Sequence, residues 1–302
     1  MRSAESIREA NVRYHDLAAR HYDSKWGIRY DEVGQAQVIG KLRKALGHEP
    51  RRYARALEIG AGTGYFSLNL LGGGVVREAV ATDISPGMLH RLEHSAEERG
   101  LRIETAVCEA AELPFEDASF DLVHGHAVLH HLPDLDAAFR EFRRVLRAGG
   151  VMAFCGEPSS YGDRIAAWPK RGANAVAPVW RTLMGAAPRA PANGNGRGSD
   201  EEQRLERLVD VHAFTPAELD GRARAAGLER VRVSGEELAA SLFGWVNRTL
   251  EASADPLDVP WAWRVYAYRG YLLLQSLDRS LLEPRLPAAL FYNLLLSAHA
   301  PR

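Results

Sequence analysis

Short apolar runs alternate with stretches of helical periodicity in the middle of this chain. Short, mainly apolar runs that each end at or near a polar residue occupy residues 56–59 and 80–83, and residues 151–154 are apolar throughout. Residues 88–92 between the last two place Met, Leu and Leu on one face of a helix. Short strands that are apolar throughout, separated by helices, are typical of a parallel sheet covered on both faces. The pattern therefore predicts an α/β core over residues 51–157.

The flanking segments have other patterns. A loop near residues 187–200 is rich in Pro, Gly, Asn and Arg, which predicts mobility. We expect the two insertions to form a helical lid. The predicted segments are N-terminal helices over 1–50, the core over 51–157, an insertion over 158–213, a core helix and strand over 214–235, a helical insertion over 236–286 and a final core strand over 287–302.

The first apolar strand leads directly into a glycine turn. Residues 56–66 read Ala-Leu-Glu-Ile-Gly-Ala-Gly-Thr-Gly-Tyr-Phe. Glycine tolerates positive φ and lets backbone N–H groups approach a ligand closely. The spacing is G-x-G-x-G, and Tyr65 stands where the third glycine of a dinucleotide fingerprint would be. The turn resembles motif I of class I S-adenosylmethionine-dependent methyltransferases. That resemblance implies a cofactor-binding turn made of Glu58, Gly60, Ala61, Gly62 and Gly64.

Two further motifs follow at the spacing of that family. Asp83 ends the second strand, where the resemblance implies that its carboxylate accepts both ribose hydroxyls, with Ile84 and Met88 beside it. An acidic residue in this place also serves NAD folds, so Asp83 alone does not separate the two cofactors. Glu109 stands six positions before the Phe of Leu-Pro-Phe, where family members usually have Asp. The resemblance assigns Glu109 to the adenine amino group and Ala110 to the ring.

The same resemblance implies the overall fold and the bound group. We expect a Rossmann-like sheet of seven strands in the order 3-2-1-4-5-7-6, with strand 7 antiparallel and helices on both faces. The cofactor is S-adenosylmethionine and the product S-adenosylhomocysteine. In this family the N-terminal helices close over the cofactor, often with a tyrosine, and Tyr14 and Tyr22 are the candidates.

Four histidines follow the fourth predicted strand, at the edge where a class I site lies. They are His124, His126, His130 and His131. They could pack the cofactor pocket, as predicted for His126, or one of the last three could act as a general base, His130 first. A metal site is not expected, because no cysteine or acidic residue follows at ligand spacing. Glu157 ends the fifth strand and could bind or deprotonate substrate, or serve as a turn carboxylate.

Composition and charge indicate the expected cellular compartment and the classes of binding partner. The formal net charge of −1 gives no field that would attract a polyanion, so we expect no nucleic acid partner. The first residues lack an apolar signal segment, and no stretch approaches the roughly 20 apolar residues of a membrane span. Cys108 and Cys155 fall on predicted core strands and are expected to be free thiols. A cytoplasmic enzyme without stable membrane insertion is the expectation, and the oligomeric state stays open.

The acceptor is predicted from what surrounds the core. Five tryptophans lie in the two insertions and could line an apolar pocket. Residues 124–127 read His-Gly-His-Ala in place of the Asn-Pro-Pro-Tyr type of motif used on exocyclic amines. We therefore expect O-methylation of a small or medium-sized, apolar, aromatic or polyketide-like natural product.

Several other functions stay open at this stage. The aromatic stretch 261–274 also fits a lipid or quinone methyltransferase at a membrane surface. A protein or nucleic-acid methyltransferase, a non-catalytic S-adenosylmethionine-binding subunit and an NAD-dependent dehydrogenase are the remaining alternatives.

Overall fold

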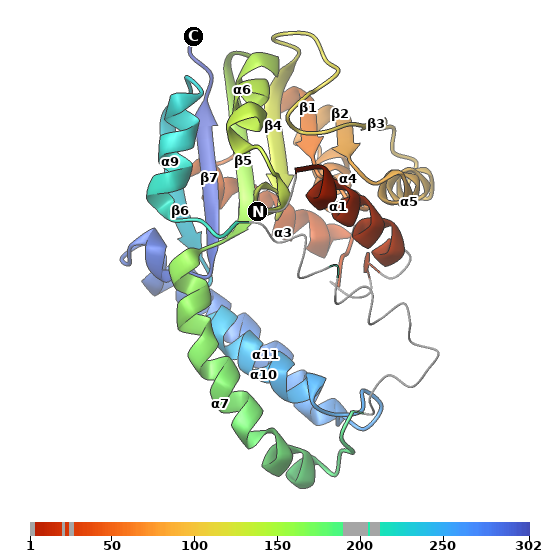
Figure 1. Ribbon diagram of the computed structural model, residues 1–302, viewed down its shortest axis with the longest axis vertical. Coiled ribbons are helices and arrows are strands. Elements are labelled where there is room, and N and C mark those ends of the chain that lie inside the picture. Colours follow the sequence, from red (N-terminus) through yellow and green to blue (C-terminus); the bar gives the residue numbers. More distant parts are fainter. Residues whose placement is uncertain (1–3, 20–21, 24–26, 190–204, 206–211) are drawn as a thin grey trace. The chain divides into compact units, whose positions relative to one another are not determined.

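The chain divides into two compact units, which we describe separately. The computed structural model describes residues 4–19, 22–23, 27–189, 205 and 212–302 (Figure 1). Unit 1 comprises Met1–Glu157, Gly198–Val233 and Leu295–Arg302, and unit 2 comprises Pro158–Arg197 and Ser234–Leu294. From residue 190 onward, the loop predicted to be mobile near 187–200 lies outside the described residues.

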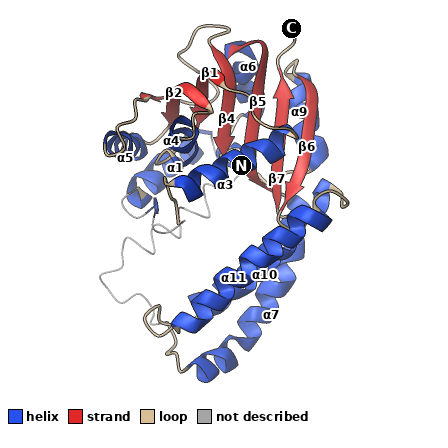
Figure 2. Cartoon of the chain, turned by 180° about the vertical axis from the view of Figure 1, so that it is seen from behind, coloured by secondary structure: helices blue, strands red, loops and turns tan. Residues whose placement is uncertain are grey.

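A seven-stranded sheet in the order β3-β2-β1-β4-β5-β7-β6 organises unit 1 (Figure 2). Pairing is parallel between β1 and β2, β1 and β4, β2 and β3, and β4 and β5. The predicted strand order is therefore confirmed. The strands are β1 (Tyr53–Ile59), β2 (Val76–Asp83), β3 (Glu104–Val107), β4 (Phe120–His126), β5 (Leu146–Pro158), β6 (Glu229–Glu236) and β7 (Asn293–His299).

Backbone hydrogen bonds show that β7 runs antiparallel to β5, as predicted. At the start of β5, Ala300 donates its N–H to the Gly150 carbonyl at 2.9 Å. At the end of β5, Ser159 donates its N–H to the Tyr292 carbonyl at 2.9 Å. The beginning of one strand thus lies beside the end of the other.

Alternate residues of β5 pack against helices on opposite faces of the sheet. Val151, Ala153 and Cys155 share a core cluster with α3 (Glu32–Leu46) and α4 (Tyr65–Gly72). The Phe154 ring stacks on Phe142 of α6 (Leu135–Val145), with centroids 5.1 Å apart. Since successive side chains of a strand point to opposite faces, both faces are covered. The helix α9 (Pro216–Ala225) contacts α6, and α5 (Pro86–Glu97) shares a cluster with α4.

Local signals explain where the helices begin and end. Ser85 caps α5 by accepting the Met88 N–H, and Pro86 is its first residue. Within the region 1–50 predicted to be helical, Asp31 caps α3 and Gly47 ends it in a left-handed conformation. Thr215 and Glu218 form a capping box at the start of α9, the helix predicted within 214–235.

Two sequence interpretations were wrong in detail. The apolar run 288–296 is not one strand, because Ala288–Leu290 forms a 3-10 turn after Pro287 and β7 begins only at Asn293. Proline presets the φ of a turn and disfavours a continuous strand there. Cys108 lies just after β3 and not on it, whereas Cys155 is buried in β5.

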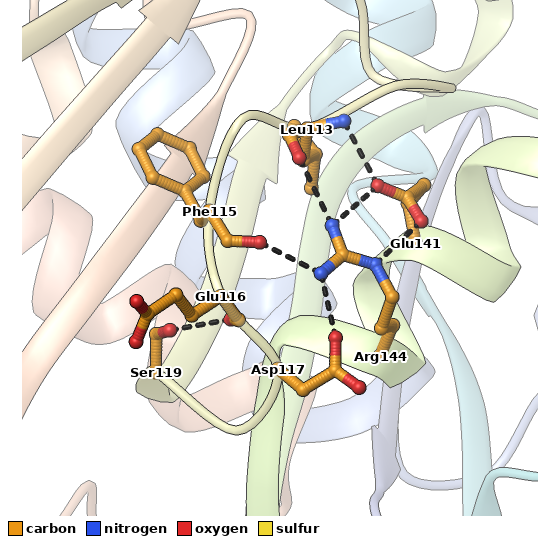
Figure 3. Close-up of polar contacts among 7 residues, drawn as sticks. All are labelled: Leu113, Phe115, Glu116, Asp117, Ser119, Glu141 and Arg144. Carbon is orange, nitrogen blue, oxygen red and sulfur yellow. Dashed lines mark hydrogen bonds and ion pairs between the residues drawn. The ribbon is translucent and has the colours of Figure 1, made fainter.

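Arg144 at the end of α6 fixes the loop that leads into β4 (Figure 3). It donates to the backbone carbonyls of Leu113 and Phe115, at 2.9 and 2.7 Å. It also pairs with Asp117 at 2.8 Å and with Glu141, whose Oε2 in turn accepts the Leu113 N–H. These anions raise the pKa of Arg144, and Arg144 lowers the pKa of Glu141.

Unit 2 contains three long helices. α10 (Ala239–Ala252) contacts both α7 (Ser160–Met184) and α11 (Trp261–Leu277). Trp180 of α7 meets Trp263 of α11 edge to face, with ring centroids 5.1 Å apart. The helical character predicted for residues 236–286 is present. Within the described part of the chain, no helix has the length and apolar character required to cross a bilayer. A lid role for unit 2 remains a prediction.

Candidate functional site

The glycine turn between β1 and α4 has a backbone conformation and close contacts that favour glycine. Gly60, Gly62 and Gly64 have φ of 61°, 52° and 91°, a region that other residues rarely adopt. A Cβ at Gly60 would lie 2.3 Å from Val128 Cγ2, so even alanine would not fit there. The Ala61 N–H donates to the Thr82 carbonyl of β2 at 2.9 Å. The turn therefore lies at the carboxyl ends of β1 and β2, where α/β folds bind their ligands.

Asp83 ties this turn to the start of α5. One carboxylate oxygen accepts the Gly62 N–H at 2.8 Å, and the other accepts the Ser85 N–H at 2.9 Å. Each carboxylate oxygen has lone pairs for a further donor. The side chain is thus held by backbone groups in the position where the sequence predicts a ribose contact. Ile84 beside it is half-buried, and Met88 is buried against Ala19 with Tyr22 packed alongside.

Glu58 lies beneath the turn. Its carboxylate is buried and accepts the Ser67 N–H, in the first turn of α4, at 2.9 Å. Burial raises the pKa of Glu58 to about 8. This position supports the loop from below, and a direct contact of Glu58 with the cofactor remains a prediction.

The N-terminal segment reaches the same edge of unit 1. Asp16 accepts from the Ser85 hydroxyl at 2.5 Å and from the Gly87 N–H at 3.1 Å. The Thr63 hydroxyl donates to Asp23 at 2.5 Å. The Tyr22 ring lies 3.9 Å from the position a Cβ would take at Gly62. Asp16, Asp23 and Thr63 were not identified from the sequence, because nothing local marks a helical aspartate as the partner of a turn far along the chain.

Glu109 and Ala110 follow β3 on the other side of Asp83. The Cys108 N–H donates to the Asp83 carbonyl at 3.2 Å, which places this loop against β2. Glu109 forms an ion pair with Arg8 of α1 (Ala4–Ala18), with 2.5 Å between Nε and Oε1. Arg8 is a partner that the sequence did not indicate. The adenine contact of Glu109 remains a prediction.

The histidines of β4 point toward α4. The His126 ring stacks on Phe66, with centroids 5.0 Å apart, and meets Tyr65 edge to face at 5.8 Å. His124 is buried, and its ring nitrogens have no hydrogen-bond partner among the described residues. Burial lowers the pKa of His124 to about 3, so its imidazole is neutral near pH 7.

Glu157 and His130 form the most organised polar cluster of the site. Glu157 has no solvent exposure. One of its oxygens accepts the N–H groups of Val128 and Leu129 at 3.0 and 3.1 Å. The other accepts the His130 N–H at 3.2 Å and lies 2.9 Å from His130 Nδ1. A carboxylate there requires the proton on Nδ1, so Nε2 is the ring nitrogen able to take a proton.

The remaining histidines surround this cluster. The His131 ring lies 3.9 Å from that of His130 and 5.7 Å from that of His15. His212 donates its N–H to the His130 carbonyl at 3.2 Å. His15 and His212 join the site from distant parts of the chain, and no motif in the sequence indicated either. No described group of three His, Cys, Asp or Glu side chains is arranged to hold a metal ion.

The residues of unit 1 fit the cofactor that the sequence predicts. There is no room for a Cβ at Gly60, and the Gly62 N–H donates a hydrogen bond to the Asp83 carboxylate. An acidic side chain at the tip of β2 suits vicinal hydroxyls, and Tyr65 stands where a dinucleotide fingerprint has its third glycine. The turn, Asp83, Glu109 and Tyr22 are the groups that would hold S-adenosylmethionine.

Comparisons with known proteins show which family the chain resembles. Residues 57–154 match the family described as "Methyltransferase domain". The chain is 32% identical to the malonyl-acyl-carrier-protein O-methyltransferase of Methylococcus capsulatus over 224 residues, 74% of this chain and 72% of that protein. It is 33% identical to a ubiquinone/menaquinone biosynthesis C-methyltransferase of Acidiphilium cryptum over 238 residues, 74% of this chain and 88% of that protein.

A solved structure shares the fold. Phosphoethanolamine N-methyltransferase 2 of Haemonchus contortus, in complex with phosphomonomethylethanolamine and S-adenosylhomocysteine, aligns with a TM-score of 0.58 at 16% identity. The alignment covers 100% of this chain and 61% of that chain. At this identity the likeness concerns the fold alone.

Proposed function

Because the chain belongs to the class I S-adenosylmethionine-dependent methyltransferases, we propose that it methylates an acidic hydroxyl or enol oxygen of a small or medium-sized, largely apolar acceptor. S-adenosylmethionine supplies an electrophilic methyl group and leaves as S-adenosylhomocysteine. The observation that carries the proposal is the buried Glu157 carboxylate, which accepts three backbone N–H groups and lies 2.9 Å from His130 Nδ1.

His130 is the proposed general base. Glu157 orients the imidazole through Nδ1, so that Nε2 can accept the proton of the acceptor hydroxyl. The same carboxylate stabilises the imidazolium that forms, because it is buried beside the ring. The Val128, Leu129 and His130 N–H groups fix the carboxylate in turn, which keeps the base in one orientation. Glu157 is then a positioning residue and does not itself bind the acceptor.

The apolar character of the acceptor is inferred from unit 2. A groove of about 470 Å³ lies among α7, α10 and α11, within the size range of small-molecule sites. Its wall is mainly apolar, and the polar groups are the Asn247 amide, the Tyr266 hydroxyl and the Trp263 indole N–H. The lining residues are Ile165, Pro169, Leu242, Phe243, Val246, Asn247, Leu250, Trp263 and Tyr266. We propose that this groove binds apolar acceptor molecules.

The relatives suggest two alternatives, one distinguished by NMR of the product and the other by the need for a base. One relative is named as a quinone C-methyltransferase. Attack from a ring carbon also needs the neighbouring phenol deprotonated, so His130 would serve it equally, and NMR of the product would show a C-methyl group. Another relative is named as an O-methyltransferase of a malonyl group. A carboxylate acceptor carries no proton at neutral pH and would make His130 dispensable.

Methyl transfer from labelled S-adenosylmethionine tests the proposal. The acceptor panel holds phenols, hydroquinones, fatty acids, amines, RNA and protein. With a phenol, His130→Gln should lower kcat by about 10²- to 10³-fold, and Glu157→Gln by about tenfold or more. His131→Gln is the matched comparison, because the His131 ring lies beside that of His130 but is not the proposed base, and it should lose less than about threefold.

The pKa of the acceptor gives the sharper readout. If His130 removes a proton, the His130→Gln defect should shrink for more acidic phenols and at higher pH, where the acceptor ionises unaided. The affinity of the His130→Gln and Glu157→Gln variants for S-adenosylhomocysteine should stay within about twofold of the wild type, since neither replaced side chain touches the glycine turn. Label appearing mainly in RNA or protein, or a defect independent of phenol acidity, would refute the proposal.

A further inference from the structure

Exposed large apolar side chains are concentrated in unit 2. Of the seventeen found among the described residues, fourteen lie in unit 2, although it holds about a third of the chain. The most exposed on its helices include Trp168 at 74%, Leu183 at 75% and Trp261 at 77%. Soluble surfaces rarely gather so many such residues without a ligand or partner.

The outer side of α7 forms a second apolar stripe. Its buried stripe is Gly162, Ala166, Ala173, Ala177 and Trp180. The exposed apolar residues Tyr161, Trp168, Val179 and Leu183 follow at intervals of seven, eleven and four, which places them on one side of the helix, away from the buried stripe. Packing against α10 explains only the buried stripe of α7. The second, exposed apolar stripe is left without a function in the fold of unit 2.

The outer side of α11 has the same character. Trp261, Tyr268 and Leu272 are exposed and recur at intervals of seven and four. The 17 residues of α11 include Arg264 and Arg269 but no Asp or Glu. None of these residues is fully buried, although the helix is rich in aromatic and leucine side chains.

Arginines follow the aromatic residues at a fixed interval. The pairs Tyr161–Arg164, Trp168–Arg171, Trp245–Arg248, Trp261–Arg264 and Tyr266–Arg269 are each three positions apart on a helix. The Arg171 guanidinium lies 5.9 Å from the Trp168 ring, and Arg248 lies 5.5 Å from the Trp245 ring. An aromatic ring with an arginine one turn away suits the boundary of a bilayer, where the ring sits among the headgroups and the cation meets phosphate.

The charge of these helices indicates which kind of partner the exposed apolar surface binds. The three helices α7, α10 and α11 carry seven Lys or Arg and two Asp or Glu residues, against a whole chain of net charge −1. This surplus complements an anionic partner, and the absence of a membrane-spanning helix among the described residues leaves a peripheral mode. We propose that the exposed aromatic and arginine side chains of α7 and α11, here the interfacial surface, bind an anionic lipid bilayer. This does not depend on the acceptor proposed above.

Co-sedimentation of the full chain with vesicles tests the proposal. The vesicles are phosphatidylcholine alone, or with about 30% phosphatidylglycerol, an anionic content sufficient for surface attraction. We expect binding to the anionic vesicles only, weakened by salt. Trp168→Ser with Trp261→Ser should reduce the affinity at least tenfold. Arg171→Gln with Arg269→Gln should reduce it roughly tenfold to thirtyfold, since each basic residue near such a surface contributes about fivefold.

Val33→Ser is the matched control, because Val33 is an exposed apolar residue of α3 in unit 1. It should bind vesicles like the wild type. Unchanged thermal unfolding and S-adenosylhomocysteine affinity in each variant exclude a folding defect. The proposal fails if the wild type does not bind anionic vesicles, or if both double variants bind them with wild-type affinity. It also fails if the tryptophan variant loses only self-association or only acceptor turnover, which would make the surface a subunit contact or an acceptor site.

Discussion

At the scale of single residues, two buried groups of opposite type lie side by side in the core sheet. Glu58 of β1 pairs in register with His124 of β4. Burial raises the pKa of Glu58 to about 8 and lowers that of His124 to about 3. Both groups are therefore neutral in the folded protein near pH 7, which avoids burying a charge beneath the glycine turn.

The Glu58 pKa predicts a pH dependence of stability. Because the folded pKa lies above the unfolded value of 4.5, the stabilisation is complete below pH 4.5 and is lost as pH rises toward 8. Glu58→Gln keeps an oxygen that can accept the Ser67 N–H but cannot ionise. Urea unfolding without cofactor should therefore show the variant gaining several kcal/mol relative to the wild type between pH 4.5 and 8.

His124 gives the opposite trend and serves as the internal comparison. Its depressed pKa contributes stability above pH 6.5 that is lost as pH falls toward 3. In Glu58→Gln this acid-side loss should appear alone, whereas in the wild type the two trends offset each other between about pH 4.5 and 6.5. Parallel pH profiles for both proteins would show that Glu58 is ionised in the folded state.

The sequence predicted the residues that belong to short motifs. Gly60, Gly62 and Asp83 meet at one hydrogen-bonded edge because the motif encodes the strand end, the turn and the next strand end together. The partners Asp16 and His212 could not be found in this way, since their pairing depends on how distant segments fold back. Glu157 was a candidate, but its contact with His130 could not be predicted, because it depends on how close the end of β5 lies to the turn after β4.

At the scale of elements, periodicity and caps were sufficient for most helices. Asp31 and Gly47 mark both ends of α3, so its limits followed from the sequence. The strand β7 was placed too early, because apolar residues before Asn293 fit a strand and a 3-10 turn equally well. Only pairing with β5 decides where the strand starts.

The loop before β4 depends on one side chain, which can be tested. Arg144 holds the carbonyls of Leu113 and Phe115 and the carboxylates of Asp117 and Glu141. Arg144→Met should leave these acceptors without their donor and lower the free energy of unfolding by about 2 kcal/mol.

Arg140→Met is the matched change on the same helix. Arg140 is exposed on α6 and has no hydrogen bond or ion pair among those described, so its loss should stay within about 0.5 kcal/mol. Urea unfolding at constant pH measures both. Equal effects of the two substitutions would show that the loop does not rely on Arg144.

At the scale of the whole molecule, the cofactor residues and the apolar groove belong to different units. The turn, Asp83 and the His130–Glu157 cluster are all in unit 1, whereas the groove is lined only by residues of unit 2. The sequence indicated this division, because family motifs end at about residue 157 and the composition changes there. It could not indicate the groove, which arises where three helices from two separate segments meet.

The division predicts that filling the groove affects the acceptor alone. Val246 of α10 lines the groove and is half-buried, so Val246→Phe should occupy part of its volume. Loss of apolar contact worth about 1.4 kcal/mol would raise KM for the apolar acceptor about tenfold. The affinity for S-adenosylhomocysteine, measured by calorimetry, should not change. Val33→Phe, which adds the same ring to the surface of α3, should alter neither quantity.

An unchanged KM in Val246→Phe, with normal thermal unfolding, would mean that the acceptor binds outside the groove. A reduced cofactor affinity would mean that the two units do not divide the work in this way.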